Sequence, residues 1–74
     1  MNTNHHQDFV NIGLNIMYYR KKKGFTEAEL ADLIFYSSHH LQQVEKAEEN
    51  PSVELLLDIA KVLEIPVTRL FEER

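Results

Sequence analysis

The sequence predicts an all-α domain, and three observations lead to this fold class. Apolar residues recur at three- and four-residue steps along most of the chain, which is the spacing of one helix face. Glycine, proline, serine and threonine separate these stretches where helix ends are expected. No stretch of useful length alternates apolar and polar residues as a half-buried strand does. With 74 residues and no cysteine, the chain depends on compact helix packing, because no disulfide can stabilise it.

The first helix is expected over about residues 9–23. Four apolar residues at helical steps form its inner face: Phe9, Ile12, Ile16 and Tyr19. Gly24 follows, and glycine ends helices because it adopts a left-handed conformation without Cβ strain. Residues 1–8 show no apolar periodicity, so we expect a flexible tail there, ahead of a folded domain at 9–74.

Capping residues predict the next two helices. Thr26 and Glu29 have the spacing of a capping box, in which each side chain bonds the other residue's backbone N–H. Ser37 offers a second N-cap, followed by apolar residues Leu41 and Val44 on one side of a third helix. Only about three residues separate the two helices. A link this short favours a steep crossing, which is the helix-turn-helix arrangement, here at about residues 26–46.

The last third of the chain predicts one longer helix and a short turn. Pro51 and Ser52 suit the first turn of a fourth helix that runs to about residue 63. Pro66 then opens a last turn that contains Leu70 and Phe71. Successive residues on a helix turn by about 100°. In the third helix, Leu41, Val44 and Glu45 are therefore expected to point inward. The polar residues of that helix are expected to point outward: Ser38, His39, Gln42, Gln43 and Lys46.

Composition excludes several classes of protein. Apolar stretches fall well short of the roughly 20 residues that cross a bilayer, and the N-terminus lacks a signal-peptide pattern, so we expect no membrane association and a cytoplasmic location. The adjacent histidine pairs lack the spacing of a metal site, and no residues form a catalytic constellation. We therefore expect no metal, no cofactor and no enzymatic activity. The net charge of −4 argues against a generic polyanion binder.

One ordered set of residues extends over about residues 9–72 and comprises Ile12-Gly13, Ile16, Tyr19-Arg20, Gly24-Phe25-Thr26, Glu29-Leu30-Ala31, Ser37, Leu41, Val44-Glu45, Asn50-Pro51-Ser52, Leu56-Leu57, Ile59-Ala60-Lys61, Leu63 and Leu70-Phe71. This set resembles the lambda-repressor-like (XRE-type) helix-turn-helix family. The resemblance implies a compact five-helix domain that binds operator DNA, usually as a homodimer, with its third helix in the major groove. It also implies an ion pair between Arg20 and Glu45 that holds the third helix against the first.

Site residues follow from the resemblance together with side-chain chemistry. Glutamine can bond adenine, and histidine or serine can donate to guanine acceptors. The expected base-reading residues are Ser38, His39, Gln42 and Gln43. The expected contacts to the DNA backbone are Arg20, Lys21, Lys22, Lys23, Glu27, Ser37 and Lys46. The expected dimer interface consists of Leu55, Val62, Leu70 and Phe71. Two-fold symmetry would match such a dimer to a palindromic operator, and a repressor-like role is expected.

Departures from the family pattern keep a second reading open. The family usually places glutamine at the start of the second helix and glycine in the turn, where this chain has Glu27 and Phe35. Residues 24–50 hold one basic residue against six acidic ones, which disfavours contact with phosphates. The alternative is a helix-turn-helix domain that binds proteins, of the antitoxin or anti-repressor type. An apolar stripe of Leu14, Met17 and Tyr18 could hold a second protein.

Overall fold

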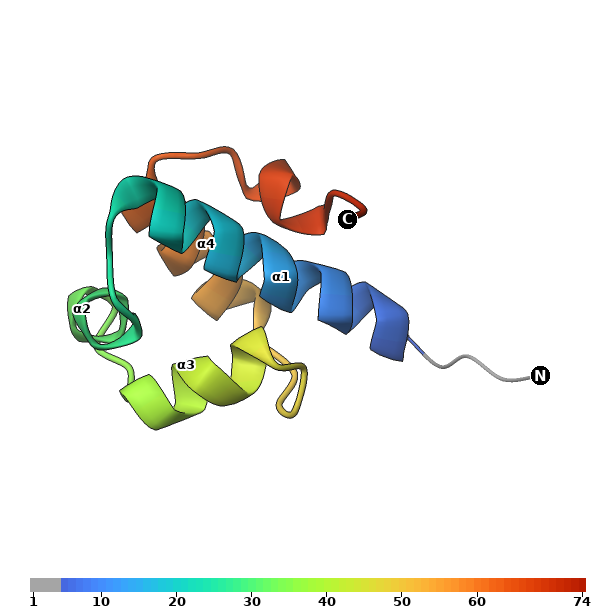
Figure 1. Ribbon diagram of the computed structural model, residues 1–74, viewed down its shortest axis with the longest axis horizontal. Coiled ribbons are helices and arrows are strands. Elements are labelled where there is room, and N and C mark those ends of the chain that lie inside the picture. Colours follow the sequence, from blue (N-terminus) through green and yellow to red (C-terminus); the bar gives the residue numbers. More distant parts are fainter. Residues whose placement is uncertain (1–4) are drawn as a thin grey trace.

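The computed structural model describes residues 5–74, which form four α-helices and a C-terminal 3-10 turn (Figure 1). The elements are α1 (His6–Lys23), α2 (Glu27–Leu33), α3 (Ser38–Glu45), α4 (Val53–Leu63) and η1 (Val67–Phe71). The predicted all-α class and the helix-turn-helix at α2–α3 are confirmed, with η1 as the fifth helical element. Among the described residues there is no strand, and no helix is long and apolar enough to span a bilayer.

Helix α1 begins at His6, three residues earlier than the apolar spacing predicts. Asp8 lies in its first turn, where a carboxylate complements the positive end of the helix dipole, and it also contacts His5 at 3.1 Å. A polar first turn can therefore be helical although it carries no apolar face. The remainder of the predicted tail, residues 1–4, lies outside the described residues.

The predicted caps begin and end the helices as expected. Thr26 and Glu29 form the capping box, with bonds of 3.0 and 2.8 Å between each side chain and the other residue's backbone N–H. The Ser37 and Ser52 hydroxyls each accept a backbone N–H at 3.1 Å, at the starts of α3 and α4. Gly24 ends α1 with φ 91°, a left-handed conformation that glycine adopts without strain.

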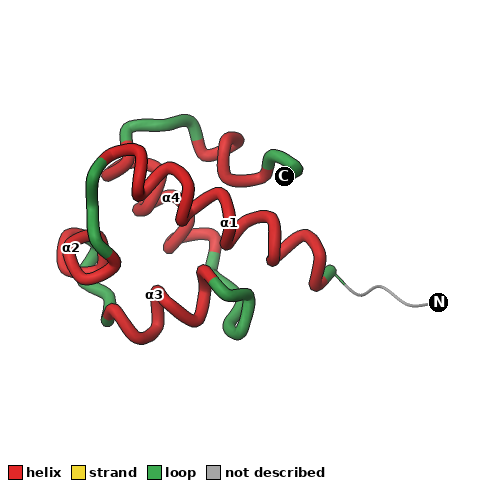
Figure 2. Tube along the Cα trace, viewed as in Figure 1, coloured by secondary structure: helices red, strands yellow, loops and turns green. Residues whose placement is uncertain are grey.

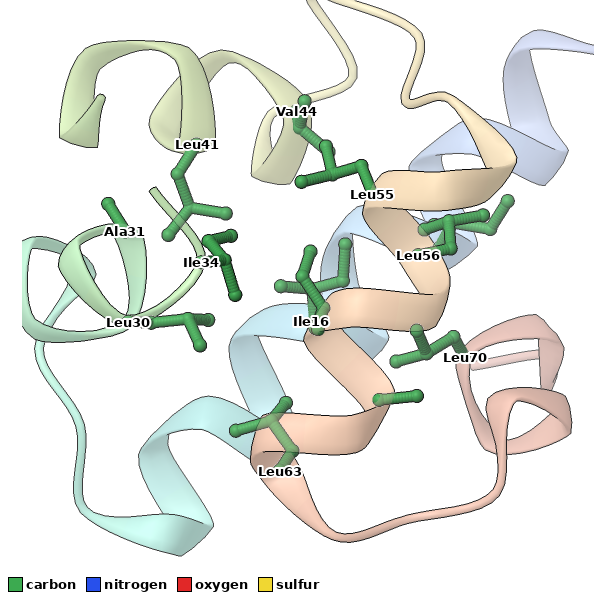
Figure 3. Close-up of a cluster of buried hydrophobic side chains, with 13 residues drawn as sticks. Ile16, Leu30, Ala31, Ile34, Leu41, Val44, Leu55, Leu56, Leu63 and Leu70 are labelled. Carbon is green, nitrogen blue, oxygen red and sulfur yellow. The ribbon is translucent and has the colours of Figure 1, made fainter. Parts of the chain in front are cut away.

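The core lies where all five elements meet (Figure 3). Its fully buried side chains include Ile16 of α1, Leu30 of α2, Leu41 of α3, Ile59 of α4 and Leu70 of η1, each 0% exposed. Every element therefore contributes at least one anchor, and removing any of them would leave a cavity that costs about 2–5 kcal/mol.

Helix α1 separates two parts of the molecule. α3 packs on one side of α1 and η1 on the opposite side, with α4 behind (Figures 1 and 2). α2 is seen nearly end-on beside α3, so the two helices cross steeply (Figure 1). The outer face of α3 therefore points away from η1.

Buried polar contacts fix the C-terminal segment to α1. Asn15 is 0% exposed, and its Nδ2 donates to the carbonyl oxygens of Leu70 at 3.0 Å and Glu72 at 2.6 Å, while its Oδ1 accepts from Arg74. The Tyr19 hydroxyl donates to Glu72 at 2.9 Å. This anchoring positions η1, and it was not predicted from the sequence.

Candidate nucleic-acid interface

The outer face of α3 is polar and exposed, as predicted. Ser38 and His39 are exposed, and Gln42 and Gln43 are half-buried. Within residues 5–74, none of these four side chains makes a hydrogen bond to another protein group. The His39 ring lies beside that of His40, with centroids 6.1 Å apart and ring planes tilted by 45°. The donors and acceptors of these four side chains are therefore available to a ligand. The inner face carries Leu41, Val44 and Glu45, which are 0%, 1% and 3% exposed.

Gly13 allows α3 to approach α1 closely. A Cβ atom at this position would lie 2.3 Å from the carbonyl oxygen of Glu45 and 2.9 Å from that of Val44. Both atoms belong to the backbone of α3, so no side-chain rotation could relieve the clash. Glycine is therefore required for the observed distance between the two helices.

Arg20 and Glu45 form a second link between α1 and α3. Arg20 Nε donates to Glu45 Oε2 at 2.7 Å and Nη2 to Oε1 at 3.2 Å, so the pair is bidentate. Arg20 Nη1 also donates to the carbonyl of Phe25 at 2.9 Å. Burial raises the pKa of the Glu45 carboxyl, an effect that Arg20 opposes and the nearby Glu27 reinforces. The end of α3 is thereby held rigidly against α1.

The surroundings of two residues expected at the DNA backbone disfavour that role. Arg20 is only 6% exposed and all of its bonds go to Glu45 and Phe25, so no phosphate can reach its guanidinium. Glu27 is half-buried, and its carboxyl lies close enough to that of Glu45 to help raise the Glu45 pKa. A carboxylate beside a phosphate would in any case be repulsive.

The remaining backbone candidates lie in different places. Lys22 Nζ lies 5.8 Å from the centre of the Tyr18 ring, and Lys23 pairs with Glu64 at the end of α4. These two lysines line a small cavity with residues of α4 and the following loop, and the structure does not bring them beside α3. Lys21 is exposed on α1. Lys46, by contrast, is exposed at the end of α3, and Ser37 is exposed at its start.

The turn between α2 and α3 contains an exposed Phe35 in a left-handed conformation and a Tyr36 that contacts the loop after α3. Phe35 is 96% exposed and has φ 57°, a left-handed conformation that a bulky residue adopts only at a cost. Tyr36 packs on the His40 ring at 5.5 Å and its hydroxyl donates to Glu49 at 3.3 Å. Partial burial and the charge of Glu49 raise the pKa of the Tyr36 hydroxyl. Tyr36 thus links this turn to the loop after α3.

The predicted dimer interface needs a correction. Leu55 and Leu70 are 6% and 0% exposed and belong to the core, so they cannot contact another molecule. Val62 is half-buried against the same core, whereas Phe71 is 54% exposed. The exposed apolar residues of α4 are instead Val53 and Leu57, one turn apart and 73% and 51% exposed. Inward and outward leucines could not be distinguished in α4 because its sequence is apolar almost all round.

The stripe on α1 is partly covered. Leu14 and Tyr18 are 41% and 45% exposed, and Met17 is half-buried. The Arg74 guanidinium lies 3.9 Å from the centre of the Tyr18 ring and covers part of it. Within residues 5–74, no group of three or more histidine, aspartate or glutamate side chains is placed to hold a metal ion.

Comparison with known proteins agrees with this geometry. A family model described as "Helix-turn-helix" matches residues 16–70, which include α2, α3, α4 and most of η1. The chain belongs to this helix-turn-helix family, of the XRE type. The predicted family is therefore confirmed. The family and the relatives below are regulators of transcription and not enzymes, as the sequence predicts.

Two curated helix-turn-helix relatives come from Bacillus subtilis strain 168. The HTH-type transcriptional regulator SinR is 34% identical over 64 residues, which are 85% of this chain and 58% of SinR. The HTH-type transcriptional regulator SlrR is 37% identical over 62 residues, which are 82% of this chain and 41% of SlrR. The chain therefore spans about half of the length of these relatives.

Solved helix-turn-helix structures superpose closely. The restriction-modification controller protein C.AhdI from Aeromonas hydrophila gives a TM-score of 0.87 at 29% identity, over 92% of this chain and 99% of the other. A structure of SinR, the master regulator for biofilm formation, in complex with DNA gives a TM-score of 0.77 at 34% identity. That match covers 82% of this chain and 98% of the SinR chain. The chain is thus similar to a regulator that was solved on DNA.

Proposed function

We propose that this protein is a sequence-specific DNA-binding transcriptional regulator that reads its operator with the outer face of α3. The observation that carries the proposal is this unpartnered polar face on a helix fixed by the Gly13 contact and the Arg20–Glu45 pair. A rigid helix loses little conformational entropy when it enters the major groove. The similarity to SinR, solved in complex with DNA, supports the same function.

The base contacts are assigned to Ser38, His39, Gln42 and Gln43. Lys46 and the Ser37 hydroxyl are placed at the two ends of α3, where they can contact phosphates on either side of the groove. The free N–H groups at the start of α3 add further donors for phosphate. This smaller set replaces the one that included Arg20 and Glu27.

The protein acts as a homodimer on a palindromic operator, with a repressor-like effect. We assign dimerisation to the exposed apolar residues Val53, Leu57 and Phe71. Two-fold symmetry would place two copies of α3 about 34–36 Å apart, one turn of DNA. In sedimentation velocity, we expect Leu57→Glu to convert the dimer into a monomer, whereas the exposed α2 variant Leu33→Glu stays dimeric.

Selection of binding sites from random duplexes tests the proposal. The protein is expected to enrich one palindromic sequence, and mobility shifts then measure affinity for that site and for single-base variants. Gln43→Ala should reduce discrimination at one base pair by about 1–3 kcal/mol, roughly 5- to 150-fold, because a bidentate contact is lost. Gln7→Ala, on exposed α1, is the matched control. Enrichment of no sequence, or unchanged discrimination in Gln43→Ala, would contradict the assignment.

A second candidate function is protein binding of the antitoxin or anti-repressor type. It is favoured by the 96% exposure of Phe35 in the turn and by the acidic residues Glu48 and Glu49 of the α3–α4 loop. This function predicts no enriched DNA sequence. It also predicts that a protein partner captured by the wild-type chain is lost with Phe35→Ser.

A further inference from the structure

Two exposed apolar patches have no role in the proposed function. Three large exposed apolar side chains are assigned to dimerisation above, and the other four within residues 5–74 form two pairs. Leu14 and Tyr18 lie one turn apart on α1 and are 41% and 45% exposed. Leu33 ends α2 and Phe35 follows in the turn, and these two are 50% and 96% exposed. Exposed apolar groups of this kind commonly mark surfaces that contact another protein.

The α1 patch, formed by Leu14, Tyr18, Lys21, Lys22 and Arg74, is basic. α3, η1 and α4 cover three sides of α1, and the apolar pair remains exposed (Figure 1). Lys22 Nζ and the guanidinium carbon of Arg74 lie 5.8 and 3.9 Å from the centre of the Tyr18 ring. Lys21 is exposed one turn after Tyr18. None of these three cations forms an ion pair within residues 5–74.

The α2 patch, formed by Glu29, Asp32, Leu33 and Phe35, has the opposite charge. α2 contains three acidic residues and no basic one. Glu29 and Asp32 are exposed, and neither forms an ion pair within residues 5–74. Asp32 lies in the last turn of α2, where the negative end of the helix dipole repels a carboxylate. A cation supplied by another molecule would offset this repulsion.

Phe35 also lowers the stability of the isolated domain. Its φ of 57° is costly for a residue with a Cβ, and its ring is 96% exposed to water. A contact that covered the ring would recover the cost of this exposure. A surface that is both apolar and basic would therefore match Phe35 and Asp32 together. Within the described chain, the α1 patch has this chemistry.

We propose that the α1 patch of one copy docks on the α2 patch of a second copy, in a contact separate from the dimer interface. The two apolar pairs pack together, while Lys21 and Lys22 face Asp32 and Glu29. Because the two patches are different surfaces, the contact is heterologous and adds further copies to the dimer. It is small, so it forms only at high protein concentration. It needs no DNA, so it can fail while the proposed function holds, and the reverse.

Sedimentation velocity of the full chain at increasing protein concentration tests the proposal. At low salt, we expect species larger than the dimer to accumulate. High salt should remove these species and leave the dimer, because it screens exposed charges. NMR spectra of the ¹⁵N-labelled chain over the same concentrations should shift at residues 14–22 and at residues 29–35. If no species exceeds the dimer, or if only one of these segments shifts, the proposal is wrong.

Charge reversal separates docking from general repulsion between acidic chains. Asp32→Lys adds two positive charges to a net charge of −4, which reduces general repulsion. It should nevertheless weaken the larger species about fivefold or more, because it places like charges together. Glu48→Lys makes the same change of net charge in the α3–α4 loop and should not weaken them.

The double variant Lys21→Glu/Asp32→Lys keeps the net charge of −4 and exchanges the two signs, so it should recover association. An Asp32→Lys variant that associates as well as Glu48→Lys would overturn the proposal. A double variant no better than Asp32→Lys would do the same.

Two apolar variants distinguish the new contact from the dimer interface. Phe35→Ser should weaken the larger species about tenfold and leave the dimer intact, because only the α2 patch loses apolar area. Leu57→Glu should break the dimer and retain the concentration-dependent shifts at residues 14–22 and 29–35. Circular dichroism checks that both variants are folded. Undiminished association of Phe35→Ser, or loss of those shifts in Leu57→Glu, would show that the larger species use other surfaces and would overturn the proposal.

Discussion

At the scale of single residues, the positions that matter most are buried polar ones and strained ones. Arg20 and Glu45 join two helices through a bidentate pair with side chains only 8% and 0% exposed. Phe35 has a positive φ at an exposed turn, and Glu72 accepts bonds from both Tyr19 and Arg69. Each of these makes a different physical contribution to stability, and each can be measured separately.

Breaking the Arg20–Glu45 pair on one side should be strongly destabilising. Arg20→Met leaves the Glu45 carboxylate buried without its partner, and we expect the free energy of unfolding to fall by about 3–5 kcal/mol. The double variant Arg20→Met/Glu45→Leu removes both charges and should recover most of this loss. Urea unfolding measures both. A double variant no more stable than the single one would show that the cost does not come from a stranded charge.

Replacing Phe35 by glycine should stabilise the protein by about 0.5–1 kcal/mol. The left-handed conformation costs a residue with a Cβ roughly 1–2 kcal/mol, and the larger chain entropy of glycine offsets part of the gain. Phe35→Ala keeps the Cβ and should show no such gain. Thermal unfolding followed by circular dichroism gives the comparison, and equal melting temperatures for Phe35→Gly and Phe35→Ala would contradict it.

Glu72 predicts a pH-dependent contribution to stability. Hydrogen bonds from Tyr19 and Arg69 lower the pKa of the Glu72 carboxyl below its ordinary value of 4.5. A lowered folded-state pKa means that the contribution is present above the unfolded-state value and is lost as pH falls through the folded-state value. The stability difference between wild type and Glu72→Gln should therefore be larger at pH 7 than at pH 3. A difference independent of pH would contradict the prediction.

At the scale of elements, the sequence predicts most of the fold. The capping box at Thr26, the Ser37 and Ser52 caps and the Gly24 stop all define helix ends through local bonds, so residues a few positions apart suffice to find them. Contacts between residues far apart in the sequence could be predicted less well. The Gly13 contact with α3 depends on how two helices approach, and Asn15 bonds carbonyls 55 and 57 residues away. The sequence signal for this anchoring was a pair of asparagines, Asn11 and Asn15, four residues apart inside α1.

The contact between α1 and α3 makes Gly13 sensitive to the smallest substitution. Gly13→Ala would gain about 1 kcal/mol of helix propensity, but its Cβ would clash with the α3 backbone. We expect a net loss of about 1–3 kcal/mol together with weaker DNA binding, because α3 must move. Urea unfolding and mobility shifts measure the two effects, with Gln7→Ala as the control in α1. Wild-type stability in Gly13→Ala would contradict the packing described.

At the scale of the whole molecule, charge and site position were the least predictable features. The sequence correctly indicated which residues of α3 point outward, because helical periodicity alone fixes that. It could not show that Lys22 and Lys23 lie toward α4 and the C-terminal segment, or that Leu55 and Leu70 are interior. Both depend on how helices distant in sequence pack together. The protein thus has a net charge of −4 and, in addition, very few basic side chains near α3.

This charge distribution predicts a shallow salt dependence of operator binding. With Lys46 as the main cation at α3, a dimer should neutralise few phosphates, and the slope of log K against log salt should be about −2 to −4. Lys46→Ala should reduce the slope by about 1 per protomer, whereas Lys22→Ala should leave it unchanged. Fluorescence anisotropy between 50 and 300 mM salt measures this. A slope that changes only with Lys22→Ala would place the basic run of α1 on the DNA.

Within the described part of the chain, the side chains of Ser38, His39, Gln42 and Gln43 make no hydrogen bonds to other protein groups, and this bears on how such a regulator can diversify. None of these side chains contributes a hydrogen bond to the fold. Substituting them should therefore change the DNA sequence that is recognised without lowering the stability of the domain. Gene duplicates could therefore acquire new target sequences by a few substitutions on one short helix. The same freedom makes this domain a convenient frame for engineered DNA specificity.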